Sequence, residues 1–150
     1  MITRFLEDES ATLALGRALA PALCPGLVVY LTGELGAGKT TLARGILRGV
    51  GFDGRVKSPT FTVVEVYKFS RLYLYHFDFY RFGQPNEFAD SGLREYFDAN
   101  AVCLVEWPEK AAGLPPADLR IALGVSGAGR SVALDADTEA GTLCLERLHY

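Results

Sequence analysis

The architecture of this chain is set by residues 27–50, which read LVVYLTGELGAGKTTLARGILRGV. The first part, Leu27–Leu31, is an unbroken apolar run that is typical of a strand buried on both faces. Thr32–Gly38 is a glycine-rich turn, and Lys39–Val50 has the spacing of an amphipathic helix ended by the glycines at positions 49 and 51. A buried strand, a glycine-rich turn and a helix in this order predict an α/β fold with a phosphate-binding loop.

Residues 33–40, GELGAGKT, fit the phosphate-loop pattern G-x-x-x-x-G-K-[ST]. Glycine permits the backbone angles that turn successive N–H groups onto a triphosphate, and the following helix N-terminus favours an anion. We expect Lys39 to reach the β- and γ-phosphates and the Thr40 hydroxyl to bind Mg²⁺. The alternative is a glycine-rich turn with a chance lysine, but the flanking strand and helix favour nucleotide binding. The predicted nucleotide contacts in this segment are Glu34, Leu35, Gly36, Ala37, Gly38, Lys39, Thr40 and Thr41.

A carboxylate at the end of a second apolar run completes the predicted site. A phosphate loop needs an acidic group nearby to orient Mg²⁺ or water. Glu106 directly follows Ala101–Val105, the second strand that we expect to be fully buried. We predict that Glu106 acts as a base or orients water, with indirect contact to the metal, and that Lys39, Glu106 and Asp78 are the catalytic residues. The alternative for Glu106 is a strand-end carboxylate that faces solvent.

Residues 76–81, HFDFYR, concentrate polar side chains at one strand end. Strand alternation puts His76, Asp78 and Tyr80 on one side and two phenylalanines on the other. Asp78 is therefore a second candidate for the magnesium shell. His76 is either part of that site or a core histidine.

Other positions are open between functional and structural roles. Thr60, within Ser58–Thr60, either offers a hydroxyl to Mg²⁺ or the γ-phosphate or belongs to an ordinary turn. Trp107, the only tryptophan, either covers the site or packs the domain edge. Arg81, Arg94 or a partner's arginine are the candidates for stabilising the transition state, and because none is marked by a motif we expect slow turnover by the chain alone.

The remaining segments predict a mixed sheet with helices on its faces. Ser10–Ala20 reads as a helix capped by Ser10, and Pro85–Asp98 contains one or two short helices. Two strands joined by a short link form an antiparallel hairpin. The expected strands outside the phosphate-loop unit are Phe61–Tyr67, Leu72–Phe77, Ala101–Val105, Leu119–Val125, Ser131–Asp135 and Thr142–Leu145.

Composition narrows the class of protein. At 150 residues and 49% hydrophobic content, the chain is expected to form one packed domain, residues 1–150. The net charge of −3 is opposite to that of a free-standing nucleic-acid binder. We expect no membrane span and no signal peptide, because no apolar run is long enough. The three cysteines read as reduced core residues, which places the protein in the cytoplasm of a prokaryote-like cell or in an organelle matrix.

Five segments together resemble the TsaE (YjeE-type) ATPases, a bacterial family for threonylcarbamoyladenosine modification of tRNA. They are, in the family's order, GELGAGKTT (33–41), KSPTFTVVE (57–65), YHFDFYR (75–81), GLREYF (92–97) and CLVEWPE (103–109). The resemblance covers nearly the whole chain and is weakest after residue 116. It implies a P-loop NTPase fold of three αβα layers with a mixed parallel and antiparallel sheet.

The resemblance also implies ligands, site residues and partners. The nucleotide is ATP, in agreement with the lack of an N-K-x-D guanine motif. Thr40 and Glu106 match the family's magnesium ligands, Asp78 matches its aspartate, and Glu9 and Arg130 fall near its adenosine contacts. Family members hydrolyse ATP slowly alone and act with a TsaB–TsaD heterodimer, whose TsaD-like transferase modifies adenosine 37 of tRNAs that read ANN codons. The resemblance then implies that this chain contacts tRNA only indirectly, through the complex with its partners.

Two other functions stay open at this point. A small-molecule P-loop kinase uses the same loop, although this chain is short for a substrate domain and an arginine-rich lid. A non-hydrolysing adaptor binds ATP only to dock its partners, and it tolerates the loss of Glu106.

Overall fold

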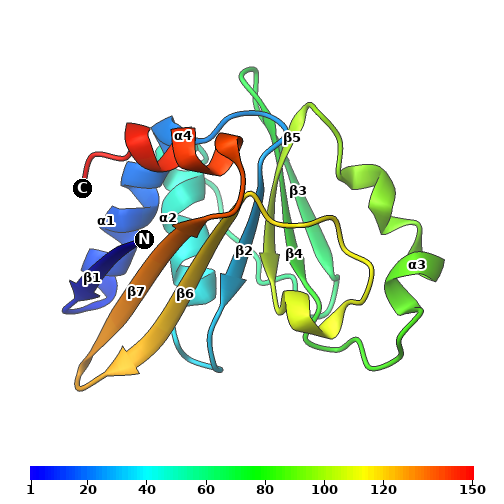
Figure 1. Ribbon diagram of the computed structural model, residues 1–150, viewed down its shortest axis with the longest axis horizontal. Helices are drawn as coiled ribbons and strands as arrows, with labels where there is room; N and C mark the ends of the chain where they lie inside the picture. The colour runs from blue at the N-terminus through cyan, green and yellow to red at the C-terminus, as the bar shows by residue number, and fades with distance from the viewer.

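In the computed structural model, which describes residues 1–150, seven strands form one sheet in the order β1-β7-β6-β2-β5-β4-β3 (Figure 1). The strands are β1 (Ile2–Leu6), β2 (Val28–Thr32), β3 (Val64–Lys68), β4 (Tyr73–Asp78), β5 (Ala101–Glu106), β6 (Leu119–Ser126) and β7 (Gly129–Ala136). The α-helices are α1 (Glu9–Leu19), α2 (Lys39–Val50), α3 (Glu87–Ser91) and α4 (Glu139–Arg147). Three short 3₁₀ helices are η1 (Ala20–Ala22), η2 (Leu93–Tyr96) and η3 (Pro108–Lys110).

The centre of the sheet is parallel and its flanks are antiparallel. Strand β2 pairs in parallel with β5 and β6, and β5 pairs in parallel with β4. The pairs β3–β4, β6–β7 and β1–β7 are antiparallel. The mixed α/β sheet and the predicted hairpin are therefore confirmed. Because the carboxyl ends of β2, β4 and β5 meet at one edge, Asp78 and Glu106 stand in register beside the phosphate loop.

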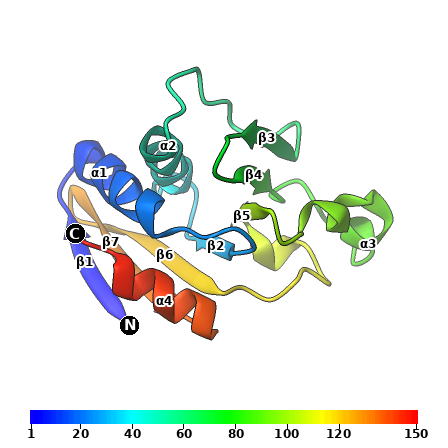
Figure 2. The ribbon, with the colours of Figure 1, turned by 90° about the horizontal axis from the view of Figure 1, so that it is seen from above.

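Helices α1 and α2 lie side by side on one face of the sheet (Figure 2). Two glycines allow this close approach. A Cβ atom at Gly16 of α1 would lie 2.6 Å from the Leu42 carbonyl oxygen, and one at Gly45 of α2 would lie 2.5 Å from the Leu13 carbonyl oxygen. The larger hydrophobic core fills the space between these helices and the sheet. This packing fixes the N-terminus of α2 against the edge where the strands end.

The second face carries the other layer of the predicted three-layer arrangement. Short helices α3, η2 and η3 and their loops cover β2, β5 and β4 there, with α3 at one end of the molecule (Figures 1 and 2). A second core rich in aromatic side chains lies beneath them. Phe77 and Phe97 stack at 4.9 Å between ring centroids, and Tyr75 meets Tyr96 edge to face at the same distance. This layer holds β4 and β5 together behind the predicted site.

Several local predictions are wrong. Helix α1 is capped by Asp8, whose carboxylate accepts from the Ala11 N–H, and not by Ser10. Strand β1 lacks a predicted counterpart, because only its last residue is buried and its order depends on pairing with β7. Cys24 is exposed, whereas the other two cysteines are buried as expected.

The segment Thr142–Leu145 is helical and not a strand. Helix α4 begins after Thr138, whose hydroxyl accepts from the Gly141 N–H. Gly141 and Cys144 are its buried residues, three positions apart as a helix requires. Four residues were too few to separate the helical periodicity from the strand periodicity, and packing against β7 and η1 decides the outcome.

None of the helices in the structure is both long and apolar enough to cross a membrane.

Candidate functional site

The phosphate loop connects β2 to α2 and depends on glycine at three positions. Gly33, Gly36 and Gly38 have φ values of 142°, 81° and 107°, in the region that other residues rarely adopt. At Gly33 there is also no room, since a Cβ atom would lie 2.4 Å from the Leu123 carbonyl oxygen. The loop therefore keeps its shape only with these residues.

The loop presents main-chain donors that the chain itself does not use. The N–H groups of Gly38, Lys39, Thr40 and Thr41 donate to no acceptor within the protein. They belong to the first turn of α2, where no carbonyl is available one turn earlier and the helix dipole is positive. They face a cavity of about 230 Å³ lined by Leu35, Gly36, Ala37, Gly38, Lys39, Thr40, Thr41, Thr60, Asp78, Glu106 and Trp107. Such a cradle suits a phosphate group.

Lys39 is buried at the start of α2, with 5% of its surface exposed. Its ammonium group donates to the carbonyl oxygens of Gly33 and Glu34 and lies 3.8 Å from the centre of the Trp107 ring. Burial lowers the pKa of Lys39, while the nearby carboxylates, Glu106 first among them, act in the opposite direction. The positive charge is thus held inside the cavity by its own loop and an aromatic face.

Glu106 is the last residue of β5 and is also buried. The Thr40 hydroxyl lies 3.2 Å from its Oε1 atom and 3.1 Å from its Oε2 atom. The Nε2 atom of His76 lies 2.6 Å from the same Oε2. The alternative of a solvent-facing carboxylate is therefore wrong, because α2 and β4 enclose Glu106.

Asp78 ends the neighbouring strand and completes the acidic side of the cavity. Its Oδ2 atom accepts from the Thr60 hydroxyl at 3.1 Å, and its Oδ1 atom accepts from the Tyr80 N–H at 2.8 Å. Burial raises the pKa of Asp78 above its ordinary value, and these two hydrogen bonds counteract the increase. Thr60 therefore lines the cavity beside Asp78, to which its hydroxyl is bonded. Tyr80 follows the strand and takes part with its main chain.

Trp107 covers the cavity and also packs the domain edge. Its backbone is left-handed, with φ of 57°, which is uncommon outside glycine. The ring lines the cavity, lies 5.0 Å from the Tyr80 ring and packs against the second core. This turn directs the tryptophan toward Lys39 immediately after Glu106.

A second hollow of about 290 Å³ adjoins the first on the α1 side of the loop. Arg130, at the start of β7, donates to the Gly36 carbonyl oxygen at 3.0 Å. Glu9 lies in the first turn of α1 and pairs with Arg44 at 3.7 Å. Sequence reasoning placed both residues here only through the resemblance. The residues lining this hollow are Asp8, Glu9, Thr12, Gly36, Gly38, Thr41, Ala128, Gly129 and Arg130.

Sequence reasoning missed Asp8 and Thr12, which line this second hollow. Aspartate is a preferred N-cap residue, so Asp8 could have been recognised as the cap of α1, but Ser10 competed with it. Arg81 and Arg94, the two arginines considered for the transition state, lie elsewhere. The Arg81 guanidinium covers the Phe61 ring at 4.9 Å, and Arg94 donates to the Gly113 carbonyl oxygen. The chain therefore brings no arginine to the first cavity.

The donor set fits magnesium held together with phosphate. Hydroxyl and carboxylate oxygens are the ligands that Mg²⁺ prefers, and Thr40, Glu106 and Asp78 supply them at one cavity. No group of three or more histidine, cysteine or acidic side chains is arranged to hold a metal by itself. Mg²⁺ in proteins commonly keeps waters and substrate phosphates among its ligands, so a partial protein shell is what this chemistry requires.

Comparison with known proteins identifies the family of this chain. The family model described as "Threonylcarbamoyl adenosine biosynthesis protein TsaE" matches residues 6–132. A TsaE protein of Haemophilus influenzae is 42% identical over 146 residues, 93% of this chain and 92% of the relative. A TsaE protein of Bacillus subtilis is 45% identical over 67% of this chain and 62% of its own.

The crystal structure of Bacillus subtilis YdiB superposes with a TM-score of 0.80 at 32% identity, covering 98% of this chain and 93% of that one. The likeness therefore extends over nearly the whole fold. With a family model over most of its length and a relative matched nearly end to end, this chain belongs to the TsaE family.

Proposed function

We propose that this protein binds ATP with Mg²⁺ and hydrolyses it slowly, as an ATPase subunit. The observation that carries the proposal is the phosphate loop, whose four free N–H groups face a cavity closed on its other side by the carboxylates of Asp78 and Glu106. Donors for phosphate and ligands for a cation thus converge on one space. P-loop hydrolysis depends on this kind of positioning and charge neutralisation.

The residues divide the proposed reaction between them. The loop amides and the Lys39 ammonium hold the β- and γ-phosphates, for which Lys39 leaves its carbonyl partners. Mg²⁺ bound at Thr40 neutralises charge that develops on the phosphate oxygens. Glu106 orients the attacking water or the metal's water shell. Asp78, next to it on β4, supports the same shell together with Thr60.

The second hollow supports ATP as the nucleotide. It shares Gly36, Gly38 and Thr41 with the phosphate cavity, so a nucleotide whose phosphates lie in the first places its nucleoside in the second. Glu9 and Arg130 supply an acceptor and a donor for that nucleoside. No N-K-x-D guanine motif is present in the sequence.

The relatives' names point to the biological role. Proteins named for tRNA threonylcarbamoyladenosine biosynthesis match most of this chain. We propose that the ATPase serves that modification in the cytoplasm, together with a TsaD-like transferase and a TsaB-like subunit. The acidic net charge of −3 suits contact with tRNA through the complex and not by this chain alone. With no arginine at the cavity, we expect partner binding to accelerate hydrolysis.

The test is phosphate release from Mg-ATP by the wild-type chain and by Glu106→Gln, each with and without the TsaB- and TsaD-like partners. The expected result is slow hydrolysis that the partners stimulate, with binding but no stimulated hydrolysis by the variant. Phosphoryl transfer to an added nucleoside or nucleotide would instead identify a kinase. Full modification activity of the complex with Glu106→Gln would identify an adaptor.

A further inference from the structure

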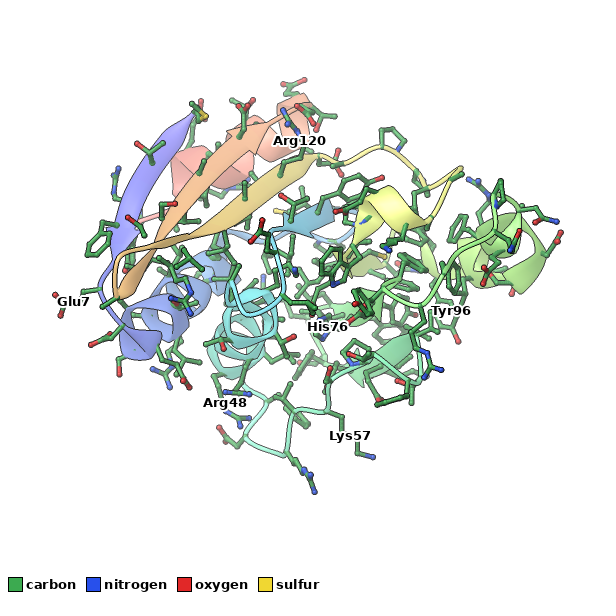
Figure 3. The ribbon with its side chains drawn as sticks, turned by 90° about the horizontal axis from the view of Figure 1, so that it is seen from below. Glu7, Arg48, Lys57, His76, Tyr96 and Arg120 are labelled. Carbon is green, nitrogen blue, oxygen red and sulfur yellow. The ribbon has the colours of Figure 1, made fainter.

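His76 is a buried polar side chain to which the proposed reaction gives no role. It lies on β4 beside α2, with none of its surface exposed (Figure 3). Its Nε2 atom lies 2.6 Å from Glu106 Oε2, and its Nδ1 atom has no hydrogen-bond partner. A buried polar atom without a partner is uncommon in native proteins. The unpartnered Nδ1 therefore helps to decide which ring nitrogen of His76 carries the proton.

Three protonation arrangements of the His76–Glu106 pair are conceivable, and they differ in what they leave unpaired. An imidazolium buries an unpaired Nδ1–H together with its charge. A proton on Glu106 that is donated to Nε2 also requires the Nδ1–H tautomer, again with a buried unpaired donor. A neutral ring with its proton on Nε2 donates to the carboxylate and leaves only a lone pair on Nδ1. The third arrangement leaves an acceptor unpaired and not an N–H donor, and buried N–H groups without a partner are the rarer of the two in native proteins.

We propose that His76 is a positioning residue, which donates from Nε2–H to Glu106 and holds its carboxylate against Thr40. This inference rests on the proposed function, because it assigns how the metal- and water-orienting carboxylate is aimed. Oε2 receives the His76 bond and lies 3.1 Å from the Thr40 hydroxyl, which leaves Oε1 with the Thr40 contact alone, at 3.2 Å. One oxygen is therefore anchored and the other is available to a ligand in the cavity.

The choice of glutamate at this strand end explains the need for such an anchor. Glutamate has one more rotatable bond than aspartate, and a loose carboxylate would lose side-chain freedom each time it met its ligand. A donor fixed within a strand removes that freedom in advance. Partners of this kind, behind a metal-binding group, change metal affinity or activity by about 10- to 100-fold when they are removed.

The first test measures the tautomer and needs no nucleotide. The chain has two histidines, and His149 is exposed near the C-terminus, so it serves as an internal reference. In ¹⁵N-labelled protein we expect the His76 ring to show a protonated Nε2 and an unprotonated Nδ1, with slow exchange of the Nε2 proton. A protonated Nδ1 in the ligand-free protein would overturn the inference.

The second test compares two substitutions. Gln at position 76 keeps an amide donor near the Nε2 position, whereas Leu keeps the bulk and removes the donor. In the presence of ADP, Mg²⁺ affinity is measured through the fluorescence of Trp107, which lies at the cavity. We expect His76→Leu to weaken Mg²⁺ binding by about 10-fold or more and His76→Gln to stay within a few-fold of wild type. His149→Gln is the control for loss of an exposed ring.

Hydrolysis by the same variants separates positioning from nucleotide binding. We expect His76→Leu to lower kcat by about 10-fold or more with little change in KM, and Gln to restore most of it. Equal losses in both His76 variants, or none in either, would overturn the positioning role. If the wild-type chain neither binds nor hydrolyses Mg-ATP, the proposed function fails, whereas the ring spectra still report whether His76 donates to Glu106.

Discussion

The phosphate loop and the acidic wall opposite it, formed by Asp78 and Glu106 with His76 buried behind them, shape the two sides of the cavity by different means. The loop uses contiguous residues and binds through main-chain N–H groups. The wall uses side chains from two strands that meet only because β4 pairs with β5. The shape of one side of the cavity therefore depends on local backbone conformation, whereas the shape of the other side depends on the register between two strands.

The difference has an energetic side. The loop's N–H groups are dipoles at a helix end, and they offer positive potential without burying a full charge. The wall buries carboxylates, for which desolvation is costly, as the raised pKa of Asp78 shows. Its two carboxylates are stabilised by hydrogen bonds with neighbouring side chains, Glu106 with His76 and Asp78 with Thr60. We therefore expect loop substitutions to affect nucleotide binding and wall substitutions to affect metal use and hydrolysis.

The largest effect is expected in the loop, from Lys39→Ala. Loss of the ammonium group removes a charged donor from the phosphates, and each hydrogen bond of this kind contributes about 1.5–3 kcal/mol of binding free energy. ATP affinity is then expected to fall by about 100-fold or more. Titration with a fluorescent ATP analogue measures this. Lys57→Ala, on an exposed lysine that points into solvent, is the charge-matched control (Figure 3). Normal ATP titration by Lys39→Ala would remove the lysine from the binding site.

Glu106→Gln is expected to have the next largest effect and to act on a different quantity. The amide keeps the shape of the side chain but loses the negative charge that orients water or metal. We expect single-turnover hydrolysis to fall by about 100-fold or more, while ATP affinity stays within a few-fold. A parallel loss of binding would mean that the wall and the loop do not act separately.

Asp78→Asn is expected to give a smaller loss of hydrolysis, about 10-fold, with a weaker dependence on Mg²⁺.

The ionisation of Asp78 also affects the stability of the fold, and the effect has a definite sign. Burial raises the pKa of Asp78 above 3.8, so the folded protein binds the carboxyl proton more tightly than the unfolded chain does. The free energy of unfolding therefore falls as pH rises from 3.8 through the pKa of the folded state.

Asn in place of Asp78 removes this penalty. Relative to wild type, Asp78→Asn should gain free energy of unfolding at pH 7 and gain little near pH 4. Urea denaturation at the two pH values measures the difference. An equal shift at both values would show that the ionisation of Asp78 does not contribute.

The smallest effect is expected from Arg130→Ala, in the hollow beside the loop. Arg130 lies outside both the phosphate amides and the wall, so its removal should weaken ATP by about 3- to 10-fold, the value of one hydrogen bond. Binding of inorganic tripolyphosphate should be unchanged, because that ligand has no nucleoside. Arg55→Ala, at an exposed arginine, is the control. Equal weakening of both ligands would place Arg130 at the phosphates instead.

How far the fold was predictable depends on how local each signal was. Helix α2 begins and ends where its sequence predicts, because glycine and the apolar spacing mark both ends. The segment at α4 was misread, since Thr142–Leu145 satisfies a strand pattern over a window too short to test it. Strand β1 carries almost no signal of its own, and it is ordered by pairing with β7.

The phosphate loop was determined by the order of residues alone. Glycine torsions and a helix start depend on neighbours in the chain, so the pattern at residues 33–40 predicts both the shape and the ligand class. The contact between His76 and Glu106 was decided only by tertiary structure. A shift of one residue in strand register would turn either side chain to the opposite face of the sheet, and that register is set by packing across the whole core.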